Sequence, residues 1–260
     1  MSLYLMMLKR NHKALWLWSI SVSSMVFLVI VLYPFVKDVY AAMPEEIMVI
    51  LEQFGGIPED ALEYYATEGA MMLQLFGAIY AAMLGFGLIS AVEKEKTAEM
   101  LYTQGVSKKR FHLANMITLL TLVILFSCIQ AMVGFFGFML INENINIGHY
   151  LYFQLLNAFM YLVMGLIGYL LAVSLKPAMK QMVALIVPLP LYIITIISSL
   201  TNEDWLKNLK HISPFTFSDP VVILKEQVGI DLISLYVYIG LSLIIVVSTY
   251  FIYRKRIHLL

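Results

Sequence analysis

The polar residues best suited to chemistry are concentrated in one short stretch, residues 93–104, with the sequence EKEKTAEMLYTQ. Most of these residue types favour a helix. Acidic residues at its start suit the positive end of a helix dipole, and Gly105 supplies a residue that commonly ends helices. The stretch therefore predicts a short amphipathic helix that offers charges and an apolar ridge to a partner. The alternative is a connecting loop whose charges only orient the segments on either side.

Residues needed for catalysis or metal binding are sparse elsewhere. The five histidines are scattered without metal-ligand spacing, and the single cysteine, Cys128, excludes an intrachain disulfide. The sequence contains no H-E-x-x-H, no G-x-S-x-G and no G-x-x-x-x-G-K-[ST] pattern. We therefore expect no metal site, no cofactor bound by this chain and no enzyme activity of its own. Any step driven by ATP would have to use a partner's ATPase.

Composition places the chain in a membrane. Hydrophobic residues make up 61% and charged residues 13%, with a mean hydropathy of +0.84. Each uncharged stretch reaches the roughly 20 residues that a helix needs to cross the hydrocarbon layer. The sequence predicts an all-α integral membrane protein, a single domain over residues 1–260, whose six transmembrane helices cover residues 14–36, 69–92, 113–141, 150–175, 181–200 and 232–253.

Basic residues are distributed asymmetrically between the two sets of loops. Of the 17 lysines and arginines, all but Lys37, Lys207, Lys210 and Lys225 lie at the termini, in residues 93–110 or in residues 176–180. This bias predicts that both termini and residues 93–104 are cytoplasmic. The net charge is zero, which gives no reason to expect a nucleic-acid partner.

Residues 1–13, MSLYLMMLKRNHK, combine an apolar patch with a basic cluster. This pattern predicts an N-terminal interfacial helix before the first span. A basic flank that only sets the orientation of that span is the alternative.

Two further patterns lie within the spans. Gly77, Ala81 and Gly85 recur at four-residue spacing, which allows close helix packing, either within the subunit or against another subunit. Pro188 and Pro190 each remove a backbone donor, so they predict a kink or a break in the fifth span.

The last outer loop contains the apolar segment PFTFSDPVVIL. It is apolar enough to enter the outer leaflet or to cap a central pathway, and its candidate gate residues are Pro214, Phe215, Phe217 and Pro220. A surface amphipathic segment is the alternative.

The stretch that begins at Glu93 resembles the cytoplasmic signature of type-2 ABC exporter permeases, in which an acidic run leads into G-T-L-E-x-L-L-x-T-P-V-S-R/K. Lys96 and Gly105 stand where the family usually has Gly and Pro. The family also has six spans with cytoplasmic termini, an N-terminal interfacial helix and an S-P-F-x-x-x-x-P-like segment, similar to SPFTFSDP here. The residues in register with the signature, after Glu93 and Glu95, are Thr97, Glu99, Leu101, Val106, Ser107 and Lys108.

The resemblance implies a permease subunit of an ATP-driven exporter. In such a protein residues 93–104 form a coupling helix that docks on a separate ATPase subunit, which binds ATP and magnesium. A second permease subunit, identical or different, would complete a central pathway. The implied coupling residues are Glu93, Glu95, Thr97, Glu99, Leu101 and Val106.

The expected location is the bacterial cytoplasmic membrane, with the chain as a multi-pass protein in lipid. Uncharged spans favour a hydrophobic or amphipathic substrate, such as a peptide or a drug-like molecule. Export of sodium ions remains an alternative. So does an ATP-independent role, as a carrier, an assembly factor or a sensor partner.

Overall fold

The computed structural model describes residues 3–44, 58–95, 97, 103, 105–201, 203–225 and 231–255. These residues form helices and connecting segments, and no strand occurs among them. Six helical segments within this part of the chain are long and apolar enough to cross a membrane, which confirms the predicted number of spans and indicates a multi-pass membrane protein. The long helices are α1 (Leu3–Ala41), α4 (Met71–Lys94), α6 (Lys108–Leu140), α7 (Ile147–Ser174), α8 (Pro188–Leu200) and α10 (Leu232–Lys255).

Shorter helices complete these segments. α3 (Ala61–Tyr64) and the π-helical η1 (Tyr65–Ala70) run directly into α4, and η2 (Gln181–Ile186) precedes α8. Between α8 and α10 lie α9 (Asp204–Asn208), η3 (Leu209–Ile212), η4 (Thr216–Ser218) and η5 (Val221–Lys225).

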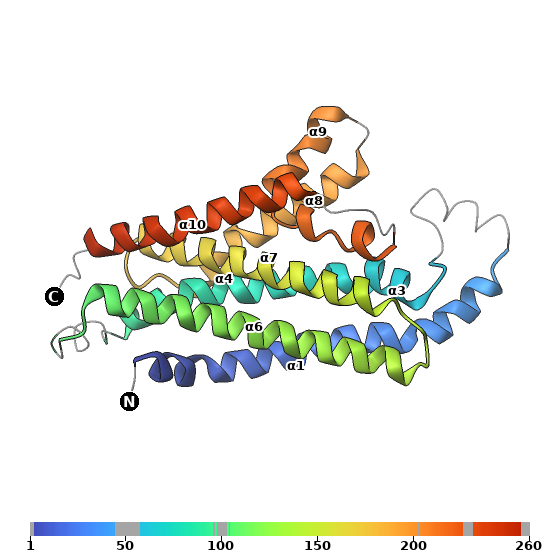
Figure 1. Cartoon of the computed structure of the whole chain (residues 1–260), viewed down its shortest axis with the longest axis horizontal. Helices are drawn as coiled ribbons and strands as arrows, with labels where there is room; N and C mark the ends of the chain where they lie inside the picture. Colours follow the sequence, from blue (N-terminus) through green and yellow to red (C-terminus); the bar gives the residue numbers. More distant parts are fainter. Residues whose placement is uncertain are drawn as a thin grey trace.

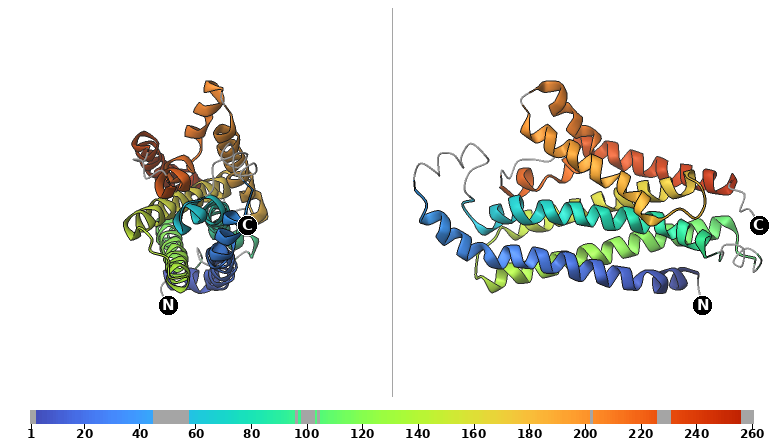
Figure 2. Two further views of the ribbon diagram at one scale, coloured as in Figure 1. Left: turned by 90° about the vertical axis from the view of Figure 1, so that its right-hand side faces the viewer. Right: turned by 180° about the vertical axis from the view of Figure 1, so that it is seen from behind.

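The helices form an elongated bundle (Figures 1 and 2). α1 and α6 lie along one side, α4 and α7 occupy the centre, and α8 and α10 lie on the other side. The first residues of α1 and the last residues of α10 lie at the same end of the bundle (Figure 1). The end of α8 and α9 project away from the other helices.

Glycine allows α4 and α7 to approach to backbone contact. A Cβ atom at Gly85 would overlap the carbonyl of Gly165, and one at Gly165 would lie 3.3 Å from the Ala81 carbonyl oxygen. Gly77 lies against the ring of Tyr161 in the same way. The small residues predicted from their four-residue spacing therefore pack within the chain, against α7.

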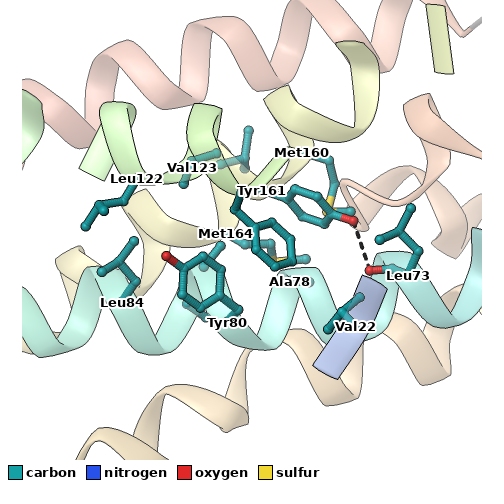
Figure 3. Packing of buried hydrophobic residues seen from close by; sticks show 14 of the residues in the cluster. Val22, Leu73, Ala78, Tyr80, Leu84, Leu122, Val123, Met160, Tyr161 and Met164 are labelled. Carbon is teal, nitrogen blue, oxygen red and sulfur yellow. Dashed lines mark hydrogen bonds between the residues drawn. The ribbon is translucent and has the colours of Figure 1, made fainter. Parts of the chain in front are cut away.

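Hydrogen bonds between buried polar side chains and neighbouring helices fix the rotation of these helices. The Tyr161 hydroxyl donates to the Leu73 carbonyl at 2.9 Å and accepts from Asn157 Nδ2 at 2.8 Å. Figure 3 shows the bond to Leu73 among the apolar side chains of the core. On the other side of the bundle, Ser23 of α1 donates to Gln130 Oε1 of α6 at 3.1 Å. Each bond satisfies a group that would be costly to bury alone.

The predicted interfacial helix is wrong as a separate element. α1 is a single helix of 39 residues that begins at Leu3, and residues 3–13 are its first three turns. Met7 is completely buried, and the Tyr4 hydroxyl lies 3.1 Å from Thr121 Oγ1 of α6. Contacts with the bundle therefore extend the first span beyond its uncharged core.

The break predicted in the fifth span is confirmed. The 3₁₀ helix Gln181–Ile186 ends just before Pro188, which is the first residue of α8. Proline is accepted at the first position of a helix because the amide hydrogen that it lacks would have no partner there. The fifth span is thus a short 3₁₀ turn followed by a helix of 13 residues.

Candidate functional site

The predicted coupling residues lie at the end of α4 and in its connection to α6. Glu93 lies in the last turn of α4, and Glu95 follows its end. Thr97 and Val106 are described, whereas Glu99 and Leu101 lie outside the described residues. The predicted helix over residues 93–104 therefore stays a prediction, and its flanks define the candidate site.

Glu93 connects α4 to the loop between α7 and η2. Its Oε2 atom accepts a hydrogen bond from the Ala178 amide at 3.2 Å. Ala178 has a φ of 60°, in the left-handed region that costs a residue with a Cβ about 1 kcal/mol or more. The carboxylate thus holds a strained loop residue against the end of the central helix.

Arg10 of α1 approaches the same end of α4. Its guanidinium donates to the Leu88 carbonyl at 3.5 Å and interacts electrostatically with Glu95. Thr97 folds back on α4, because its hydroxyl donates to the Val92 carbonyl at 3.2 Å. The beginning of the connection is therefore hydrogen-bonded to α4 and lies within the electrostatic influence of Arg10 in α1.

The connection ends in a defined turn at α6. Gly105 has a φ of +80°, a conformation that glycine adopts without strain. Val106 packs partly buried against the apolar core. Ser107 Oγ accepts from the Arg110 amide at 3.3 Å and so caps the start of α6.

The start of α6 is also joined to the end of α10. Lys108 Nζ donates to the Arg254 carbonyl at 3.1 Å, and the rings of Phe111 and Tyr253 stack with centroids 5.5 Å apart. Ends of α1, α4, α6 and α10 therefore meet here (Figure 1). The basic residues that these elements and the α7–η2 loop bring to this end are Lys9, Arg10, Lys13, Lys94, Lys108, Lys109, Arg110, Lys176, Lys180, Arg254 and Lys255.

A cavity of about 460 Å³ lies beside this connection. Lys94 and Glu95 line one wall, and Met179 and Gln181, at the start of η2, line another. Gln181 also packs against Gly87 of α4, where a Cβ atom would overlap its side-chain amide. The loop before α8 therefore rests directly on the last turns of α4.

The predicted gate residues are packed inside the other half of the bundle. Pro214, Phe215, Phe217 and Pro220 are all buried. Phe215 lies edge-on to Tyr192 of α8, with centroids 5.3 Å apart, and the Phe217 ring is 5.5 Å from that of Tyr238 in α10. The segment is thus an apolar plug between α7, α8 and α10, and the surface alternative is wrong. Whether it acts as a gate stays a prediction.

Gln74 of α4 anchors this plug. Its side-chain amide donates to the Ser218 carbonyl at 2.5 Å and contacts the Ser218 hydroxyl at 3.0 Å. Both residues are buried. The plug is therefore fixed to the same helix that ends in the candidate coupling site.

Reasoning from sequence did not assign Arg10, Ala178 or Gln181 to the site. The sequence identifies Arg10 only as one of the basic residues, whereas its partly buried contact with the Leu88 carbonyl of α4 depends on tertiary structure. The sequence LKPAMKQ contains a proline and two lysines, which indicates a turn but not its contact with Glu93. The pairing depends on tertiary structure.

Comparison with protein-family models gives no match, and comparison with characterised proteins gives none either.

Proposed function

We propose that this chain is the membrane-spanning permease subunit of an ATP-driven exporter and that a separate ATPase subunit energises it. One observation carries the proposal. The connection with the family-like sequence leaves from α4, the central helix of the bundle. Glu93, at the end of α4, bonds to the loop before α8, and Glu95 interacts electrostatically with Arg10 of α1. A partner that moves residues 93–106 would therefore act on three membrane segments together.

The helix contacts supply a route for that movement. α4 and α7 meet at Gly85 and Gly165 by backbone contact, so they move as one body. Gln74 extends the same body to the plug at Ser218. ATP binding to the partner drives the change if the partner binds one arrangement of this end more tightly than the other.

Composition and architecture support a location, a second subunit and a class of cargo. The basic end lies in the cytoplasm of a bacterial cell, and a second permease subunit completes the pathway. The uncharged stretches within the six spans suit a hydrophobic or amphipathic cargo, such as a peptide or a drug-like molecule.

Charge reversal at the coupling stretch tests the proposal. Glu95→Lys with Glu99→Lys is expected to lower ATP-dependent transport in proteoliposomes more than tenfold, because like charges at a docked interface repel. Membrane insertion stays normal, since both residues lie outside the spans. Glu203→Lys, a reversal in the loop before α9, is the control and keeps full transport.

Co-purification distinguishes this function from an ATP-independent carrier, assembly factor or sensor partner. We expect an ATPase subunit to co-purify with the wild-type chain and to be lost from the double variant. Transport that continues without any ATPase, or that is unchanged by both reversals, contradicts the proposal. Transport of sodium ions but of no peptide or drug would contradict the proposed hydrophobic or amphipathic cargo and would leave the proposed permease role intact.

A further inference from the structure

A second cavity, of about 580 Å³, is lined by residues of α8, α9, η3, η4 and η5 and by Asp231, which directly precedes α10. Its volume is within the range typical of small-molecule sites. Its lining contains no residue of the stretch 93–106. Its lining combines hydroxyls, charges and apolar side chains.

Most polar groups in this lining already have partners. His211 Nδ1 lies 2.9 Å from Asp231 Oδ2, and Ser234 donates to the same oxygen at 2.6 Å. Asp219 accepts from the Val221 amide at 2.9 Å. Both carboxylates of the lining are thus engaged within the protein.

Three groups of the lining have no such partner. Ser198 is 4% exposed, and its hydroxyl has no hydrogen-bond partner among the described residues. Lys207 and Lys210 form no ion pair with any described carboxylate. A buried hydroxyl without a partner is costly, and two ammonium groups beside it attract an anion.

The opposite part of the lining is apolar. Phe217, Val222 and Ile223 contribute to it, and Phe217 and Ile223 are buried. Next to the lysines, Trp205 is 66% exposed and Ile212 is 58% exposed. Tryptophan is enriched where membrane helices meet the lipid headgroups, so this pattern places the cavity at headgroup level.

We propose that this cavity binds an anionic amphiphile that carries a phosphate group. The phosphate lies between Lys207 and Lys210 with Ser198 as a further donor, and the attached apolar part packs on Phe217 and Ile223. Basic pockets between membrane helices bind phospholipid headgroups in this way. A membrane phospholipid is one source of such a group, and a soluble phosphate is the other.

Calorimetric titration of the purified full-length chain separates these sources with three probes. We expect dihexanoyl phosphatidylglycerol, below its micelle concentration, to bind. Dihexanoyl phosphatidylcholine, which has the same chains and no net charge, and inorganic phosphate, which has no chains, bind at least tenfold more weakly. Equal binding of both lipids overturns the anion site, and phosphate binding as tight as that of phosphatidylglycerol overturns the apolar half.

Variants test the assigned residues. Lys207→Gln and Lys210→Gln each weaken phosphatidylglycerol binding about fivefold. Lys37→Gln, which removes a lysine from an exposed ion pair outside the cavity, is the control and leaves the affinity unchanged. An unchanged affinity in the Lys207→Gln/Lys210→Gln double variant contradicts the proposal.

Ser198→Ala separates binding from folding. The lost donor weakens binding, whereas the thermal stability stays the same or rises, because an unsatisfied buried hydroxyl is removed. A fall in stability with unchanged affinity assigns Ser198 a structural role and overturns its part in the site.

Discussion

The central helices and the outer helices of the bundle are held together in different ways. In the most apolar window of Ala61–Lys94, 72% of the residues are buried, and in that of Ile147–Ser174, 67%. The corresponding shares are 17% for Gln181–Ser199 and 28% for Leu232–Lys255. The central pair meets by backbone contact, whereas the end of α8 and Asp231, just before α10, line a cavity with polar and apolar walls.

This difference separates a rigid part of the molecule from an adjustable one. Close-packed helices have few alternative arrangements, since a small shift creates overlap or a void. A cavity with polar walls can exchange contacts with water or a ligand at lower cost. We expect substitutions in the central pair to affect folding and substitutions around the cavity to affect finer properties.

Gly85→Leu is the substitution expected to have the largest effect, and it tests the close packing of α4 against α7. The new side chain would overlap the Gly165 carbonyl, so α4 and α7 would have to separate. We expect a loss of about 3 kcal/mol in the free energy of unfolding, measured by thermal denaturation in detergent. Gly240→Leu in α10 is the matched control, because a Cβ atom at Gly240 has no neighbour within 4 Å. Equal melting temperatures for the two variants would contradict the rigid central pair.

Gln74→Leu tests the link between the central pair and the plug. It leaves Ser218 without its amide partner, at an expected cost of about 1 kcal/mol, as is typical of side-chain hydrogen bonds between membrane helices. Asn115→Leu in α6 is the control. The Asn115 side chain is buried without a hydrogen-bond partner in the described part of the chain, so this exchange costs nothing or stabilises. A stability of Gln74→Leu that is unchanged, like that of Asn115→Leu, would show that the plug is held by apolar packing alone.

The features that could be predicted from sequence are those determined by residues close together along the chain. The lengths of the uncharged stretches predicted the six spans, and the backbone donors missing at Pro188 and Pro190 predicted the break before α8. Four-residue spacing identified Gly77 and Gly85 as packing residues, although not their partner helix.

The features that could not be predicted depend on contacts between distant residues. Gln74 and Ser218 are 144 positions apart, and neither residue type indicates that pairing. The continuation of α1 through residues 3–13 depends on the burial of Met7 against the bundle. At the candidate coupling site, sequence identified Glu93 and Glu95 but not their partners, the Ala178 amide and the Arg10 guanidinium.

Asp231→Asn is expected to change the free energy of unfolding least, and it tests the region around the cavity. Burial disfavours the Asp231 carboxylate, but the hydrogen bonds from Ser234 and the adjacent His211 outweigh it, so the pKa of Asp231 lies below its ordinary value. Because the folded state has the lower pKa, the carboxylate adds to the free energy of unfolding at pH values above the ordinary aspartate pKa, near 4. This contribution is lost as the pH falls through that value and below it. Because the pair is partly exposed, we expect less than about 1 kcal/mol. Melting curves between pH 3 and pH 7 should show that Asp231→Asn removes this acid-dependent loss and that Glu203→Gln, the control, retains it. An acid response that is the same in both variants would contradict the assignment to Asp231.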